Sequence, residues 1–122
     1  MAFVQDGIEQ IEAEELKALL KYKETMIIDV REPDEYEEGH IPGVPLIPMS
    51  TIPKVAEQFD QSKSYVFVCR SGSRSHHVAL FLKDQGIENV KNYYGGMLAW
   101  TGELAYGLER VIQEMNELYE KE

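Results

Sequence analysis

A short apolar run that leads directly into a polar loop places the strongest constraint on how this chain can fold. Residues 65–68 are continuously apolar, and a helical pattern of apolar residues begins after His77. An uninterrupted apolar run of this length is typical of a strand that is buried on both faces, as in a parallel sheet. The loop that connects the predicted strand to the predicted helix is Cys69-Arg70-Ser71-Gly72-Ser73-Arg74-Ser75. Because open α/β sheets place their sites at the carboxyl ends of such strands, this loop is the candidate site.

The remainder of the chain repeats the alternation of strands and helices. Because this alternation is typical of βαβ units, we expect one α/β domain over residues 1–122. Its sheet should have four or five mainly parallel strands, with helices on both faces. The other predicted strands are residues 8–11, 26–30, 46–48 and 90–94, and the other predicted helices are residues 12–21, 33–38 and two segments that begin near Ser50 and at Met97.

The apolar residues of the C-terminal segment also fall at helical spacing. They are Leu108, Val111, Ile112, Met115, Leu118 and Tyr119. We therefore expect an amphipathic helix over residues 103–121, with an acidic opposite face. Its apolar face is expected to cover the domain's own sheet, and a dimer or partner interface is the alternative. We expect a monomer or a weak dimer.

Composition and charge exclude several classes of protein. The net charge of −10 argues against nucleic acid or an anionic membrane as a partner, although residues 62–100 hold five basic and two acidic side chains. The chain has no apolar run long enough to span a bilayer and no N-terminal targeting pattern, so we expect a cytoplasmic protein. A single cysteine allows neither an internal disulfide nor a Cys-x-x-Cys motif. The adjacent His76 and His77 point in different directions on a helix, so we expect no metal site.

The candidate loop surrounds this cysteine with groups that favour an anion. Loop amides and a helix N-terminus offer unpaired N–H donors, and Arg70 and Arg74 add positive charge. Gly72 lets the loop turn its amides inward, and Ser75 is expected to cap the helix. These surroundings stabilise a thiolate, the nucleophilic form of cysteine, so we predict that Cys69 reacts covalently. The alternative is a buried cysteine with a purely structural role.

Two more polar residues are expected to act near the loop. Asp29 ends an apolar strand, and because an unpaired buried acid is costly, we predict that it pairs with Arg74. Exposure of Asp29 at the end of the strand is the alternative. His40 lies in the turn-rich segment 39–43, and we predict that it is a structural hydrogen-bonding residue rather than a general base for Cys69.

The loop sequence resembles the active-site loop of the rhodanese (thiosulfate sulfurtransferase) family, most closely its single-domain bacterial type. Three further segments resemble motifs of that family and occur in the same order, so that the likeness covers residues 26–100. They are Asp29-Val30-Arg31-Glu32-Pro33-Asp34-Glu35-Tyr36, Glu38-Gly39-His40-Ile41-Pro42-Gly43 and Gly95-Gly96-Met97-Leu98-Ala99-Trp100. The sequence departs from the family pattern at Val44-Pro45-Leu46. Because Pro45 cannot donate to a sheet, the strand there should be an edge strand or a shortened one.

The resemblance implies a two-step transfer of sulfane sulfur. A small anionic donor such as thiosulfate gives a sulfur atom to Cys69, which holds it as a persulfide until cyanide, a thiol or a sulfur-accepting protein takes it. It also implies that loop residues 70–75 bind the substrate and the persulfide, and that Asp29, Arg31 and His40 surround this loop. Neither a metal nor an organic cofactor is expected.

Two other interpretations stay open. One is a partner-specific persulfide carrier or a redox-sensing module, with the C-terminal helix as the docking element. The other is a cysteine-dependent phosphatase or arsenate reductase. Those enzymes typically have five residues between the cysteine and the arginine of the loop, whereas four separate Cys69 from Arg74. By resemblance, the shorter loop suits a single sulfur atom better than a tetrahedral phosphate.

Overall fold

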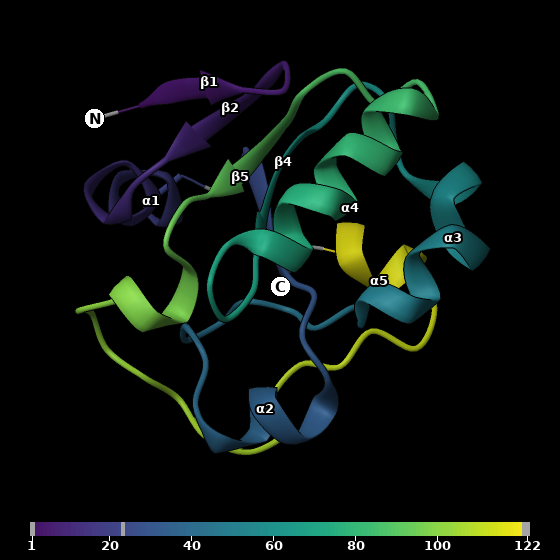
Figure 1. Ribbon diagram of the computed structural model, residues 1–122. Helices are drawn as coiled ribbons and strands as arrows, with labels where there is room; N and C mark the ends of the chain where they lie inside the picture. The colour runs from purple at the N-terminus through teal and green to yellow at the C-terminus, as the bar shows by residue number, and fades with distance from the viewer. Residues whose placement is uncertain (1, 23, 121–122) are drawn as a thin grey trace.

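The computed structural model describes residues 2–22 and 24–120, which form a five-stranded sheet with helices on both faces (Figure 1). Neighbouring strands are parallel except for the first two, and the order across the sheet is β1-β2-β5-β4-β3. The predicted α/β fold with a mainly parallel sheet is therefore confirmed. The strands are β1 (Phe3–Gln5), β2 (Ile8–Ile11), β3 (Thr25–Asp29), β4 (Ser64–Val68) and β5 (Val90–Tyr93).

Helices connect the parallel strands. The longest is α4, with 12 residues. No helix within the described ranges is long and apolar enough to cross a lipid bilayer. The helices are α1 (Ala13–Leu20), α2 (Pro33–Glu38), α3 (Ile52–Val55), α4 (Ser73–Asp84) and α5 (Asn116–Tyr119), with 3₁₀ turns η1 (Met49–Thr51), η2 (Ala56–Gln58) and η3 (Gly96–Ala99).

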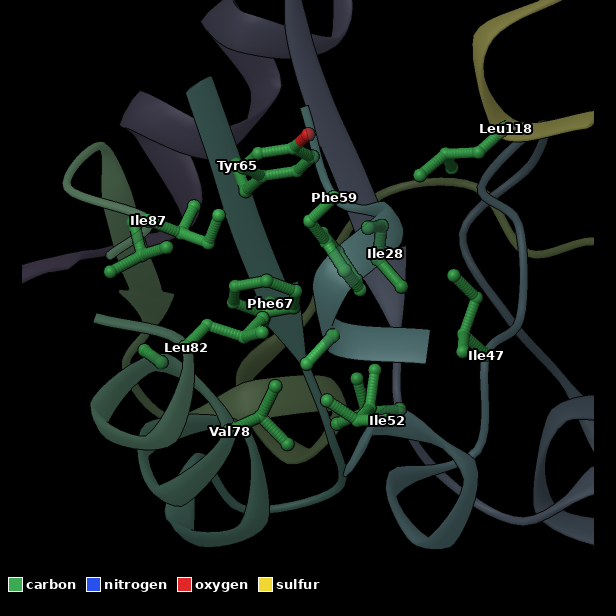
Figure 2. Close-up of a cluster of buried hydrophobic side chains, with 14 of the residues drawn as sticks. Ile28, Ile47, Ile52, Phe59, Tyr65, Phe67, Val78, Leu82, Ile87 and Leu118 are labelled. Carbon is green, nitrogen blue, oxygen red and sulfur yellow. The ribbon is translucent and has the colours of Figure 1, made fainter. Parts of the chain in front are cut away.

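The side chains of β4 alternate between two hydrophobic cores, one on each face of the sheet. Tyr65 and Phe67 join the larger core, together with residues of α3, α4 and α5, and Figure 2 shows Leu82 of α4 facing Phe67. Val66 and Val68 join the second core, which α1 covers. Because both faces of β4 are covered, its residues 65–68 are all apolar rather than alternating.

The edge strand β1 is an addition to the predicted strands. It pairs with β2 through a hairpin whose turn residues, Asp6 and Gly7, have φ angles of 55° and 79°. Two positive φ angles are the geometry of a type I′ turn, for which Asp-Gly is a preferred pair. All three residues of β1 are exposed, so the strand has no alternation of buried and exposed positions.

Prolines break up two of the predicted elements. Instead of a strand at residues 46–48, Leu46 makes single bridges to Asp29 and to Val111. The helix predicted from about residue 50 is three short pieces, η1, α3 and η2. Pro53 has no N–H group to donate to the Met49 carbonyl, so the turn at Met49–Thr51 cannot continue into α3 as one α-helix.

The predicted amphipathic helix over residues 103–121 is wrong. Within its described part, residues 103–120, only α5 is helical, and the residues before α5 lie beside the segment that contains His40 and Leu46. Ala105 and His40 exchange two backbone hydrogen bonds, and Leu46 donates to the Arg110 carbonyl. These pairings satisfy backbone groups that a helix would have satisfied internally.

The C-terminal segment nevertheless covers its own domain, as expected. Met115 and Leu118 are buried in the larger core, whereas Leu108 is 54% exposed. Gly107 has a φ of +85°, which a helix cannot accommodate. The apolar spacing therefore reports which side chains pack, while glycine and the available backbone partners decide the conformation.

Candidate functional site

Cys69 lies at the carboxyl end of β4, fully buried, at the point where the chain turns into α4. Its Sγ accepts a hydrogen bond from the Gly72 N–H at 3.1 Å, and Ser75 Oγ lies 3.3 Å away. Gly72 precedes the helix with a φ of +96°, and Ser75 lies in the first helical turn rather than at the predicted cap. The sulfur therefore lies at the N-terminus of a 12-residue helix, where N–H donors and the helix dipole favour an anion.

The turn η3 holds the loop in this shape. The Met97 and Leu98 N–H groups donate to the carbonyl oxygens of Cys69 and Arg70 at 2.9 and 3.0 Å. Gly96 makes this approach possible, because a Cβ at this position would lie 2.5 Å from each of the two carbonyl oxygens. With both carbonyls engaged by η3, the loop offers N–H groups rather than carbonyl oxygens to the sulfur.

The predicted ion pair between Asp29 and Arg74 is wrong. Asp29 instead accepts from Arg31, with Nε and Nη2 at 3.0 and 2.8 Å, and both side chains are buried. Arg31 also donates to the Gly39 carbonyl at 2.8 Å, so it braces the turn after α2. Arg74 pairs with Glu35 of α2 through two hydrogen bonds of 2.7 and 2.8 Å. The acid at the end of β3 is thus satisfied by an arginine two residues away in the same chain segment.

The pairing with Glu35 sets the charge state of this side of the site. The hydrogen bonds from Arg74, more than any other cause, lower the pKa of Glu35 to about 2. Arg74 is therefore balanced by a carboxylate over the neutral pH range. It ties the first turn of α4 to α2, and its charge is not open to a further anion.

Arg70 is the loop arginine whose charge is not balanced by a carboxylate among the described residues. Its side chain is exposed, and it makes no hydrogen bond or ion pair to any residue within 2–22 and 24–120. Ser71 and Ser73 are exposed beside it. The site therefore consists of a buried sulfur, a set of loop amides and an exposed rim that carries one unpaired cation.

His40 is a structural residue, as predicted. Nδ1 lies 2.9 Å from the Tyr36 carbonyl, Nε2 lies 2.8 Å from Glu109 Oε1, and the imidazole stacks on the Tyr36 ring at 3.7 Å between centroids. The hydrogen bond from His40 is the main cause that lowers the pKa of Glu109. Because both ring nitrogens are engaged, His40 braces the turn after α2 against the C-terminal segment and is not placed as a base for Cys69.

A second group of polar residues lies next to the loop, and the sequence analysis did not identify three of its members, Asp6, Gln10 and Asn92. Ser75 Oγ donates to Asn92 Oδ1 at 2.5 Å, and Asn92 Nδ2 donates to Gln10 Oε1 at 2.7 Å. Gln10 Nε2 lies 3.0 Å from His76 Nδ1, and His76 Nε2 lies 2.8 Å from Asp6 Oδ2. We call these five residues the polar chain.

The strand register explains why the polar chain forms. Gln10 of β2 and Asn92 of β5 are directly paired in neighbouring parallel strands, and both are about 1% exposed. His76, in the first turn of α4, is only 8% exposed. The available signal was an amide residue inside each of two predicted buried strands, because buried amides need partners.

Comparison with known proteins agrees with this architecture. Residues 12–103 match the family model of the rhodanese-like domain. "Putative sulfurtransferase YtwF" of Bacillus subtilis is 47% identical over 95 residues, which are 78% of this chain and 84% of that protein. "Putative sulfur carrier protein YrkF" of the same organism is 39% identical over 97 residues, 79% of this chain and 52% of that protein. The crystal structure of a rhodanese-like domain protein from Staphylococcus aureus has a TM-score of 0.71 at 41% identity and covers 80% of this chain and 96% of its own. The chain therefore belongs to the rhodanese-like domain family.

Proposed function

We propose that this protein is a sulfurtransferase that moves sulfane sulfur from a donor such as thiosulfate to a thiophilic acceptor, through a persulfide on Cys69. The observation that carries the proposal is the environment of Sγ. It is buried at the N-terminus of α4 with the Gly72 N–H at 3.1 Å, inside a loop whose carbonyls are engaged elsewhere. The N–H donor and the helix dipole at this position stabilise a sulfur anion.

The first step is attack by the Cys69 thiolate on the outer sulfur of thiosulfate. A bond forms between Sγ and this sulfur, the bond between the two sulfur atoms of thiosulfate breaks, and sulfite leaves with the electron pair. The outer sulfur of the persulfide then carries the negative charge, and the amides at the N-terminus of α4 stabilise it as an oxyanion hole stabilises an oxygen anion.

The second step returns the enzyme to its starting state. Cyanide or a thiolate attacks the outer sulfur of the persulfide, and a carbon–sulfur or sulfur–sulfur bond forms. The bond to Sγ breaks, and its electron pair remains on Cys69 as the thiolate. The scheme uses one cysteine, and the chain has one.

Arg70 is the residue that we expect to receive the anionic end of the donor. Sequence analysis offered Arg70 and Arg74 together, but Arg74 is held in two hydrogen bonds by Glu35. The same pairing argues against a cysteine-dependent phosphatase, because the arginine that would bind the phosphate oxygens is already bound to a carboxylate. Phosphate-ester chemistry is therefore not proposed.

A partner-specific persulfide carrier is the second candidate function. Cys69 is 0% exposed, so an acceptor must reach through the rim of the loop to touch the outer sulfur. The relative YrkF carries the name of a sulfur carrier, which supports this alternative at the level of the family. A cytoplasmic location, a protein or thiol acceptor and the absence of nucleic-acid or membrane partners stay predictions from the sequence.

Intact mass spectrometry after incubation with thiosulfate tests the proposal. Wild-type protein should gain the mass of one sulfur atom and lose it on addition of cyanide, whereas Cys69→Ser should gain nothing. The circular dichroism of Cys69→Ser should match that of wild type, so that its failure is chemical. No gain in wild type would refute thiosulfate as the donor, and a gain that cyanide cannot remove would favour the carrier.

A further inference from the structure

The polar chain connects the exposed carboxylate of Asp6 to the sulfur of Cys69 through side chains that are otherwise buried. The proposed reaction gives a task to Cys69 but none to Ser75, Asn92 or Gln10. A buried polar network is costly unless its members are satisfied, and a satisfied network fixes the orientation of each group. The orientations here can be worked out, because a backbone carbonyl oxygen only accepts hydrogen bonds.

The two amide side chains can lie in one orientation only. Gln10 Nε2 lies 3.1 Å from the Ile8 carbonyl, so this atom is the donor and Gln10 Oε1 faces Asn92. Asn92 Nδ2 donates to Gln10 Oε1 and also to the Gly72 carbonyl at 3.0 Å. Asn92 Oδ1 therefore faces Ser75, and it can only accept. Flipping either amide would place two donors or two acceptors in contact.

The histidine at the outer end keeps the amides in this orientation. Because Gln10 Nε2 is a donor, His76 Nδ1 must accept from it at 3.0 Å, which leaves the ring proton on Nε2. His76 Nε2 then donates to Asp6 Oδ2 at 2.8 Å. Each of these hydrogen bonds thus has an assigned direction, with the donor on the side of the sulfur and the acceptor on the side of the Asp6 carboxylate.

The hydroxyl group of Ser75 has one proton and two neighbours that could take it. It lies 2.5 Å from Asn92 Oδ1 and 3.3 Å from Cys69 Sγ. Both distances suit a hydrogen bond, but Asn92 Oδ1 has no donor other than Ser75 in the polar chain, so we place the proton toward Asn92. Ser75 then presents a lone pair to the sulfur, which can accept from a thiol but cannot donate to a thiolate.

We propose that Asn92 is a positioning residue that withholds the Ser75 proton from Cys69. The inference refines the reaction proposed above but is independent of the sulfur donor. Its consequence is a thiolate with one hydrogen-bond donor fewer than the loop could supply. Among thiolates of one type, the less stabilised thiolate is the stronger nucleophile, so the polar chain favours attack over storage of the anion.

The charges around the sulfur are the same in all variants of the following test. Arg74 is paired with Glu35, Arg70 lies on the rim, and Asp29 is paired with Arg31 at the end of the neighbouring strand β3. Within the polar chain, His76 is connected to the sulfur through Gln10, Asn92 and Ser75. Substitutions at positions 75 and 92 therefore change no formal charge around the sulfur.

A double-mutant cycle on the rate of Cys69 alkylation by iodoacetamide against pH tests the inference. Asn92→Leu removes the acceptor and frees the Ser75 proton, so the pH midpoint of alkylation should fall by about one unit, a tenfold change in thiolate at fixed pH. Ser75→Ala should leave the midpoint of wild type in place. The double variant should have the midpoint of Ser75→Ala, because the effect of position 92 acts through the hydroxyl.

Two results would overturn the inference. If Ser75→Ala alone raises the midpoint by about one unit, the hydroxyl donates to the sulfur in wild type. If Asn92→Leu lowers the midpoint equally in the presence and absence of Ser75, its effect does not pass through the hydroxyl. The first comparison needs no substitution at Asn92 and stands even if Asn92→Leu does not fold. Alkylation uses no sulfur donor, so either result is distinguishable from failure of the persulfide experiment.

Discussion

Gly96→Ala should destabilise the protein and impair the Cys69 loop at the same time. Gly96 has a φ of +58°, and an added Cβ would lie 2.5 Å from the carbonyl oxygens of Cys69 and Arg70. Real Cβ atoms do not approach oxygen so closely, so the loop and η3 must separate. The separation would weaken the hydrogen bonds from the Met97 and Leu98 N–H groups that hold the loop.

Gly107→Ala is the matched control, because it adds the same methyl group at the same kind of φ without a contact. Gly107 has a φ of +85°, and a Cβ there would meet no atom within 4 Å. Alanine at such a φ costs about 1–2 kcal/mol in either variant. Gly96→Ala should also weaken two hydrogen bonds, each worth about 1 kcal/mol. We expect the free energy of unfolding to fall by about 3–4 kcal/mol in Gly96→Ala and by about 1–2 kcal/mol in Gly107→Ala.

Urea unfolding of the two variants measures this difference, which corresponds to about 30-fold in the unfolding equilibrium constant. Intact mass after thiosulfate, recorded where both variants are folded, measures the loop. We expect Gly107→Ala to form the persulfide as wild type does and Gly96→Ala to form it more slowly. Equal losses of stability with equal persulfide yields would refute the claim that the close approach of η3 shapes the loop.

Two further predictions concern buried and paired side chains. Tyr93 is fully buried, its hydroxyl group has no partner among the described residues, and burial raises its pKa to about 12. Tyr93→Phe should therefore raise the free energy of unfolding by about 1 kcal/mol in urea titrations, and a loss would mean that the hydroxyl is satisfied. Glu35 has a pKa lowered to about 2 from 4.5, so its pair with Arg74 stabilises the fold above about pH 4.5 and is lost as the pH falls toward 2. The difference in the free energy of unfolding between wild type and Glu35→Gln should shrink as the pH falls over this range. A difference that does not depend on pH would contradict the lowered pKa of Glu35. In Glu35→Gln, the freed Arg74 should also lower the KM for thiosulfate.

Burial and periodicity made most of the sheet predictable. The central residues of strand β4 and of its neighbour β3 form continuous apolar runs. Such runs are typical of strands in a parallel sheet, so both strands could be predicted from the sequence. Strand β1 lacked any such signal because all of its residues are exposed, although the Asp6-Gly7 pair is a hairpin signal in its own right. Patterns thus locate strands that have a buried face, including the edge strand β3, and miss a strand such as β1 whose residues are all exposed.

The sequence predicted that a buried acid would pair with an arginine, but it did not predict which arginine. The sequence indicated that Asp29 needs a cation, but the choice between Arg31 and Arg74 depends on where α2 is placed against α4. Once α2 brings Glu35 to Arg74, the nearest cation for Asp29 is Arg31, two residues along the chain. Such a choice is made by tertiary geometry, and no spacing rule within one element decides it.

The distribution of charge at the loop bears on how a donor is recognised. A chain with a net charge of −10 repels an anion at long range, but at physiological ionic strength this repulsion is screened beyond about 8 Å. At short range the donor meets Arg70, whose charge is open, and not Arg74, whose charge Glu35 balances. In the proposed reaction, recognition of the donor would therefore be local, and it would depend on the exposed Arg70 and on N–H groups such as that of Gly72 beside the buried sulfur. In that reaction, a loop with two unpaired arginines would bind anions more tightly but would also retain the leaving sulfite, so the Glu35 pair would favour turnover over binding.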